Sequence, residues 1–147
     1  MRKFVATAIL FVTVICLISS SALASQVTHC RLPPPDNFEV KSFPADLPAD
    51  LRQTLREKFG DIASPDAPFD TAGAIIADRP NRRAIFAWTN GHRWVIAAEI
   101  LGARSATRPV WAFEVNADGS TVRFVKELRS SLMESACSAA RELATHY

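Results

Sequence analysis

Alternating apolar and polar residues in the second half of the chain predict β-strands that pair as hairpins. Asn90-Gly91 stands between two largely apolar runs that together span residues 82–101. This dipeptide readily takes the positive φ angles of a two-residue type I′ turn, which fixes the register of the strands on either side. The predicted register places Phe86 opposite Val95 and Trp88 opposite Arg93.

This register divides the side chains of the first hairpin into two sets, because successive residues of a strand point to opposite faces of the sheet. The first set is entirely apolar and predicts the face that packs on the core: Ile85, Ala87, Trp94, Ile96, Ala98 and Ile100. The second set mixes aromatic and charged residues: Arg82, Phe86, Trp88, Arg93, Val95 and Glu99. We expect the second face to lie outside the core.

A second hairpin is predicted around Asp118-Gly119, by the same turn chemistry. Its register pairs Asn116 with Thr121, Val115 with Val122, Glu114 with Arg123, Phe113 with Phe124 and Ala112 with Val125. Apolar residues then face apolar ones and an acid faces a base, although the register was chosen from the turn alone, and this agreement supports the pairing. The core side would consist of Trp111, Phe113, Val115, Val122 and Phe124.

Two helices are predicted on either side of these strands in the sequence. Apolar residues recur every four positions from Leu47 to Phe59, and Gly60 follows, so the pattern predicts a helix over residues 48–59. Ser131 precedes Glu134 by three positions, the spacing of a capping box, which predicts a second helix over residues 131–145. Its expected buried stripe is Leu132, Ala136, Ala139, Ala140 and Leu143.

Together these elements predict an α+β domain, an antiparallel meander of four or five strands with the N-terminal and the C-terminal helix packed on one face. Residues 71–77 are the candidate for the fifth strand. The domain would occupy residues 48–147. Residues 25–47 are rich in proline, which fixes φ and removes hydrogen-bond donors, and predict an extended lead-in.

Residues 1–24 predict a cleavable secretory signal peptide. Arg2 and Lys3 precede a neutral, mostly apolar run of fifteen residues, and Ala22 and Ala24 stand where a signal peptidase requires small residues. The apolar run is shorter than the roughly 20 residues that span a bilayer. We therefore expect a periplasmic or secreted protein with no stable membrane anchor after cleavage.

Export changes the charge balance and the cysteine content. The chain has 17 Lys and Arg against 15 Asp and Glu, and loss of Arg2 and Lys3 would leave the two signs equal. A neutral exported protein is a poor candidate for nucleic-acid binding. Cys16 would leave with the signal peptide, so Cys30 and Cys137 would remain as a pair in an oxidising compartment. We expect them to form one disulfide.

No residue pattern predicts a cofactor, a metal site or a catalytic centre. His29, His92 and His146 lack the H-x-x-x-H and C-x-x-C spacings of common zinc sites. The serines at 130, 131, 135 and 138 lie near a predicted helix start, without the G-x-S-x-G elbow of a hydrolase. The sequence therefore favours a non-enzymatic protein.

Arginine is concentrated between residues 79 and 108, where Glu99 is the only acid. The six arginines are Arg79, Arg82, Arg83, Arg93, Arg104 and Arg108. Arginine recognises carboxylates and phosphates bidentately. On these strands it also forms cross-strand contacts, and the register predicts that Arg82 pairs with Glu99 and that Arg93 stacks on Trp88.

If both helices cover the core face, the second face of the first hairpin becomes the expected binding surface. Its residues are Phe86, Trp88, Arg93, Val95 and Arg82, and aromatic residues and arginine are enriched in binding hot spots. We expect a small binding protein, of inhibitor or immunity type, with a protein partner on this face. The lead-in or a second copy of the chain would cover the face equally well. The alternative is a small-molecule-binding domain or enzyme with a pocket between sheet and helices or under the loop at residues 61–70.

Overall fold

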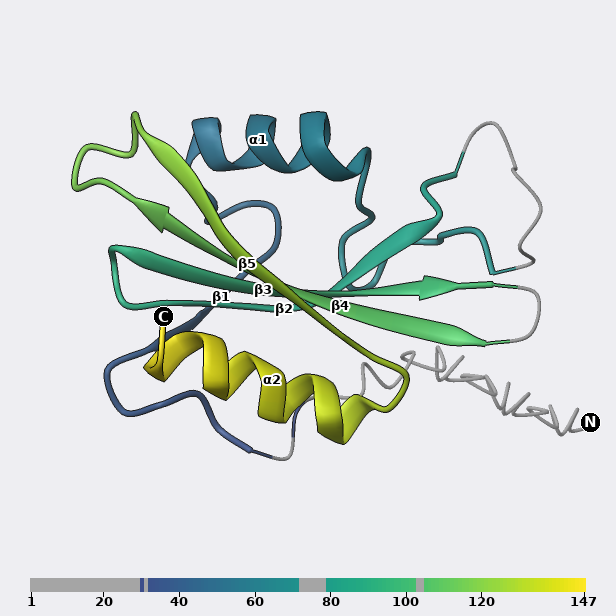
Figure 1. The fold of residues 1–147 in the computed structure, drawn as a ribbon. Coiled ribbons are helices and arrows are strands. Elements are labelled where there is room, and N and C mark those ends of the chain that lie inside the picture. Colours follow the sequence, from purple (N-terminus) through teal and green to yellow (C-terminus); the bar gives the residue numbers. More distant parts are fainter. Residues whose placement is uncertain (1–29, 31, 72–78, 103–104) are drawn as a thin grey trace, which may run out of the picture.

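A computed structural model describes residues 30, 32–71, 79–102 and 105–147, which form a five-stranded antiparallel sheet and two helices (Figure 1). The elements in chain order are β1 (Glu39–Lys41), α1 (Ala49–Phe59), β2 (Arg82–Thr89), β3 (Arg93–Leu101), β4 (Ala106–Val115), β5 (Val122–Ser130) and α2 (Met133–Thr145). The strands lie in the sheet in the same order, so the predicted α+β meander is confirmed. The predicted signal peptide and the predicted strand at 71–77, apart from Thr71, lie outside the described residues.

Helix α1 agrees with its prediction. Leu51 and Leu55 are buried, and Leu47 and Phe59 belong to the same apolar cluster. Gly60 ends the helix with φ 78° and ψ −170°. This backbone region is essentially restricted to glycine, because a Cβ atom is strained there. The amide of Gly60 donates a 2.8 Å hydrogen bond to the carbonyl oxygen of Arg56, which satisfies one of the free acceptors at the helix end.

The first hairpin has a wider turn than predicted. The pairing begins at Thr89 and Trp94, and the side-chain oxygen of Asn90 accepts hydrogen bonds from the amides of His92 and Arg93 at 3.1 and 2.8 Å. Asparagine stabilises turns through such bonds to its own loop. Trp88 therefore faces Val95 instead of Arg93, a shift of two residues that leaves side chains on their predicted faces.

A β-bulge between Ala84 and Phe86 changes the register a second time. The extra residue is Ile85, whose side chain packs with the cluster on the opposite face from the predicted one. Beyond the bulge Arg83 faces Glu99, whereas the prediction placed Arg82 there. A bulge of one residue cannot be read from an uninterrupted apolar run.

The second hairpin has the predicted register at the three strand pairs nearest its turn. Val115 faces Val122, Glu114 faces Arg123 and Phe113 faces Phe124, and all the predicted core residues of this hairpin lie in one apolar cluster. The agreement ends at a bulge, beyond which Ala112 faces Lys126 rather than Val125.

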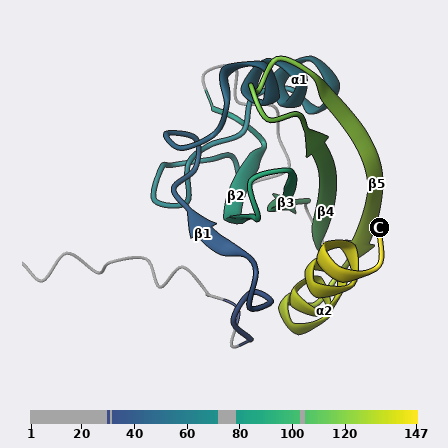
Figure 2. The ribbon, with the colours of Figure 1, turned by 90° about the vertical axis from the view of Figure 1, so that its left-hand side faces the viewer.

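The helices cover opposite faces of the sheet, so the prediction that both share one face is wrong. Helix α1 lies on one side in Figure 1 and α2 on the other, and Figure 2 shows the same arrangement from the side. The α1 cluster includes Trp94 and Ile96, whereas the α2 cluster includes Val95 and Ala97. These residues alternate along β3 and thus point to opposite faces. A strand that is apolar on both faces requires cover on both.

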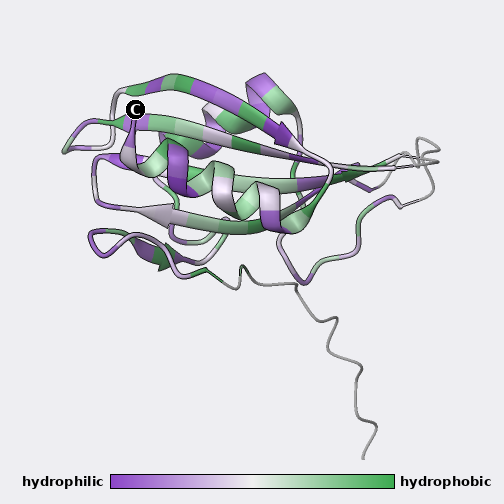
Figure 3. Ribbon diagram, turned by 60° about the horizontal axis from the view of Figure 1, so that its bottom comes forward, coloured by the Kyte–Doolittle hydropathy of each residue, from purple (hydrophilic) through white to green (hydrophobic). Residues whose placement is uncertain are grey.

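Helix α2 begins two residues later than predicted. No side chain caps its N-terminus, and the Ser130 hydroxyl accepts the amide hydrogen of Leu132, so the predicted capping box does not form. Leu132 is 65% exposed, which excludes it from the buried stripe. Figure 3 shows α2 lying along the sheet with apolar and polar residues interleaved. Its buried residues are Ala136, Cys137, Ala140, Leu143 and Ala144.

The proline-rich segment is bound to the domain at several points. Cys30 and Cys137 form the predicted disulfide, across a sequence separation of 107 residues. Phe38 is buried in the α2 cluster, and β1 pairs with the end of β2 through Val40 and Trp88. Arg141 of α2 donates a 2.6 Å hydrogen bond to the carbonyl oxygen of Pro33. The segment therefore contributes a strand, a core side chain and a covalent link.

Candidate functional site

The predicted binding face of the first hairpin is buried beneath α2. Phe86, Trp88 and Val95 are 8%, 2% and 0% exposed. They pack in one cluster with apolar residues of α2, among them Ala140 and Leu143. These three side chains are core residues, and the proposal that they form a binding surface is corrected. The face that was expected to be open is covered by α2 together with the proline-rich lead-in, whose Phe38 and Cys30 belong to the same cluster.

The two predicted arginines do not join them in one surface. Arg93 hydrogen-bonds Glu114 at 3.0 Å and also donates to the backbone oxygen of Tyr147. It does not stack on Trp88, whose ring instead lies 4.5 Å from that of Phe86 between centroids. Arg82 donates to the side-chain oxygen of Asn81 at 3.1 Å rather than to Glu99.

Two further arginines are committed to Glu99, which is buried on the α2 side of the sheet. Its carboxylate lies 2.9 Å from Arg83 and 2.6 Å from Arg108. Arg108 also donates to the backbone oxygen of Ser131, and the guanidinium of Arg83 lies 4.4 Å from the centre of the Phe69 ring. A buried carboxylate requires such partners. We therefore interpret this cluster as a structural ion-pair network and not as a binding site.

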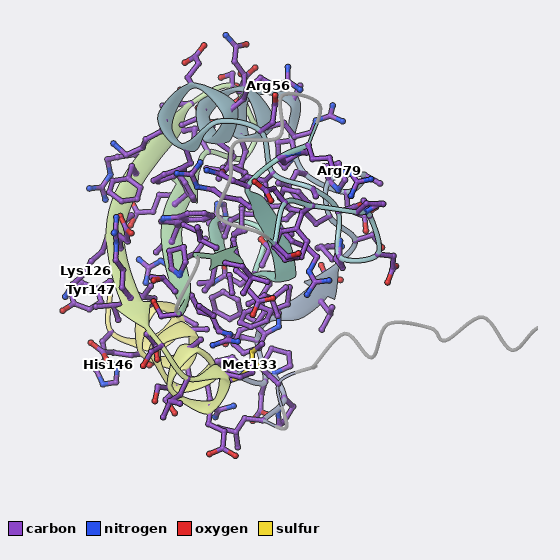
Figure 4. All side chains as sticks on the ribbon, turned by 90° about the vertical axis from the view of Figure 1, so that its right-hand side faces the viewer. Arg56, Arg79, Lys126, Met133, His146 and Tyr147 are labelled. Carbon is purple, nitrogen blue, oxygen red and sulfur yellow. A yellow bond between two sulfur atoms is a disulfide. The ribbon has the colours of Figure 1, made fainter. Side chains whose placement is uncertain are left out.

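A second charged cluster lies where β4 and β5 approach the end of α2. Hydrogen bonds from Arg123, and then from Arg93, lower the pKa of the Glu114 carboxyl below its usual value. Figure 4 shows Lys126 and Tyr147 beside one another, and the ammonium of Lys126 contacts both the ring and the hydroxyl of Tyr147. These contacts fix Tyr147 against the sheet.

A concave feature lies along α1 and is called here the α1 groove. Its volume is about 630 Å³. The lining residues are Phe43, Pro44, Ala49, Arg52, Gln53, Leu55, Arg56, Glu57, Gly60, Asp61 and Ile62. Positions 49, 52, 53, 56 and 60 recur at three to four residues and thus share one side of the helix. Of the two pocket positions expected from the sequence, the one under the loop at residues 61–70 comes nearer to this groove, because Asp61 and Ile62 are in its lining. The wall of residues 43 and 44 beside α1 arises only in three dimensions, and no local pattern indicates it.

The α1 groove combines an apolar wall with exposed charges. Phe43 and Ile62 pack partly against the α1 cluster. Arg56 and Asp61 form a 3.2 Å ion pair in which both side chains are largely exposed. The guanidinium of Arg52 has no hydrogen bond or ion pair with any residue that the structure describes. The groove therefore offers apolar contact and at least one uncommitted guanidinium.

Other site types find no support in the described part of the chain. No three His, Cys, Asp or Glu residues there are grouped closely enough to hold a metal ion. No helix among the same residues has the length and apolar character needed to cross a membrane. His92 and His146 are exposed, and His29 lies outside the described residues.

Comparison with family models, with curated proteins and with solved structures finds nothing that matches this chain.

Proposed function

We propose that this chain is an exported, non-enzymatic binding protein and that the α1 groove is its recognition site. The observation that carries the proposal is the groove itself, an open concavity of about 630 Å³ beside a helix, with apolar and arginine side chains in its lining. Arginine and aromatic residues are the types that dominate binding energy at protein interfaces. The groove replaces the buried hairpin face as the proposed contact surface.

Two features support export. The first 24 residues have the basic start, apolar run and small-residue end of a signal peptide. The disulfide between Cys30 and Cys137 is of the kind that persists in oxidising compartments and is rare in the cytosol. A periplasmic or secreted location fits both.

The two apolar clusters on either face of the sheet make the domain a rigid scaffold, which supports a role in binding. The α1 cluster and the α2 cluster fill the two faces of the sheet with large side chains, among them Trp88, Trp94 and Trp111. A rigid scaffold loses little conformational freedom on association, which favours affinity. The exposed side of α1 would then present a fixed surface to a partner.

A small molecule is the second candidate for the same groove. Ligand pockets commonly measure about 300–1,000 Å³, and the α1 groove falls within this range at about 630 Å³. The groove lies between α1 and residues 43–44 and 60–62, so it differs from a pocket between sheet and helices and touches the start of the loop at residues 61–70, the other position expected from sequence.

Affinity capture tests the proposed site. The oxidised protein is the bait against the envelope and secreted fractions of its host, and Gln53→Trp is a second bait whose indole would fill the groove from an exposed helix position. We expect the unmodified bait to retain a stoichiometric protein and Gln53→Trp to lose it.

The matched control is Glu142→Trp, which adds the same indole at an exposed position of α2. It should retain the partner. Equal retention by Gln53→Trp would show that the groove is not the contact surface. If no bait retains a protein but a metabolite raises the melting temperature of the unmodified chain and not of Gln53→Trp, the small-molecule candidate replaces the protein partner.

A further inference from the structure

We infer that the occupant of the α1 groove is an extended, acidic peptide segment of a partner protein. This inference rests on the proposed function and specifies the chemistry of its ligand. It follows from the positions of three arginines, from the weakness of their present contacts and from the apolar residues that line the same groove.

Three guanidinium groups follow one side of α1. Arg52 and Arg56 are four residues apart, a little more than one helical turn of about 5.4 Å rise. Gly60 is a further four residues along, and a Cβ atom built on it would lie 3.6 Å from Nη1 of Arg82. The guanidinium of Arg82, from β2, therefore continues the line begun by the two helix arginines.

The guanidinium groups of these three arginines make few polar contacts. The guanidinium of Arg52 has no polar partner among the described residues, and that of Arg82 has only the neutral side-chain oxygen of Asn81. Arg56 pairs with Asp61 in an exposed ion pair, and such pairs contribute little, about 0–1 kcal/mol. Glu57, the other acid of the groove, accepts a 2.7 Å hydrogen bond from Gln53. Within the groove lining the two arginines equal the two acids in number, and Arg82, beside Gly60 at the end of the groove, adds a third guanidinium. The excess of positive charge therefore comes from Arg82.

The groove lining also has an apolar part, formed by Phe43, Pro44 and Ile62. In an extended peptide alternate side chains lie about 6.8 Å apart on the same side, which is close to the spacing of Arg52 and Arg56. One row of acidic side chains would then face the arginines while the other row contacts the apolar wall. A uniformly charged polyanion would leave that wall without a partner.

The test uses oxidised protein purified from cells that express the full chain, and labelled ten-residue peptides. The probe alternates Asp with Leu, and the comparison peptides alternate Asn with Leu and Asp with Ser. Polyglutamate serves as the uniform polyanion. Fluorescence anisotropy should show tightest binding of the Asp-Leu peptide. Arg52→Glu should weaken it about fivefold, because reversal turns one attraction into a repulsion, whereas Arg129→Glu on β5 should leave it unchanged.

Several results would overturn the inference. Equal affinity of the Asp-Leu and Asn-Leu peptides, insensitivity to Arg52→Glu, or no binding of any peptide would each exclude acidic recognition. Tighter binding of polyglutamate would assign the groove to a polyanion instead. Failure here is distinct from failure of the proposed function: a partner that is lost from Gln53→Trp but kept by Arg52→Glu would leave the groove as the site and reject its acidic ligand.

Discussion

Replacement of Trp88 by alanine should cost about 3–5 kcal/mol of the free energy of unfolding, the usual range for removal of a buried aromatic side chain. Trp88 is 2% exposed, stacks on Phe86 and belongs to the cluster that α2 covers. The cost combines the lost transfer of the indole from water with the cavity that remains. Urea denaturation followed by circular dichroism measures it.

Val40→Ala is the matched control for this substitution. Val40 lies directly opposite Trp88 in the register of β1 and β2, yet it is 64% exposed. Truncation of an exposed side chain usually changes stability by no more than about 0.5 kcal/mol. If Trp88→Ala were as mild as Val40→Ala, the indole would not be buried, and the hairpin face would return as a candidate binding surface.

Loss of the disulfide should have an effect of similar size. Cys30 and Cys137 close a loop with a sequence separation of 107 residues. Removal of a native disulfide typically costs about 2–5 kcal/mol, and chain-entropy models place loops of this length near the upper end. The double variant Cys30→Ala/Cys137→Ala should therefore unfold at lower urea concentration than the oxidised protein.

A reducing agent provides the control within the same experiment. Dithiothreitol should shift the denaturation midpoint of the unmodified protein toward that of the double variant, and it should leave the variant unchanged. Equal stability of the oxidised and reduced protein would contradict a stabilising role of the cross-link between the N-terminal segment and α2.

Local patterns in the sequence were sufficient for the elements whose determinants are close together in the chain. The four-residue apolar spacing that ends at Gly60 predicts α1, and the charges of Glu114 and Arg123 agree with the register of the second hairpin. The predicted register of the first hairpin was wrong at two points. The side chain of Asn90 stabilises a wider turn than the backbone preference of Asn-Gly indicates, and the bulge at Ile85 has no signal in an apolar run.

The site was beyond prediction because it depends on contacts between distant segments. Ala97, Val110 and Ala112 lie on the same side of the sheet as the second face of the first hairpin and extend it into an apolar surface that α2 covers. The pattern of apolar residues along the strands does not indicate on which face of the sheet a helix packs. The α1 groove requires Phe43 to lie beside a helix whose exposed side looks like ordinary solvated surface. Arg82 of β2, far away in the sequence, lies beside Gly60 at the end of this groove.

The claim that both faces of the sheet are covered, from which the position of the site follows, is tested most directly by iodide quenching of tryptophan fluorescence. The three tryptophans of the chain are all buried. Trp88 belongs to the α2 cluster, and Trp94 and Trp111 belong to the α1 cluster on the other face. We expect native, oxidised protein to show almost none of the quenching seen after unfolding in guanidinium. A readily quenched fraction that disappears in Trp88→Phe would show that the face beneath α2 is open and would contradict the structure described above.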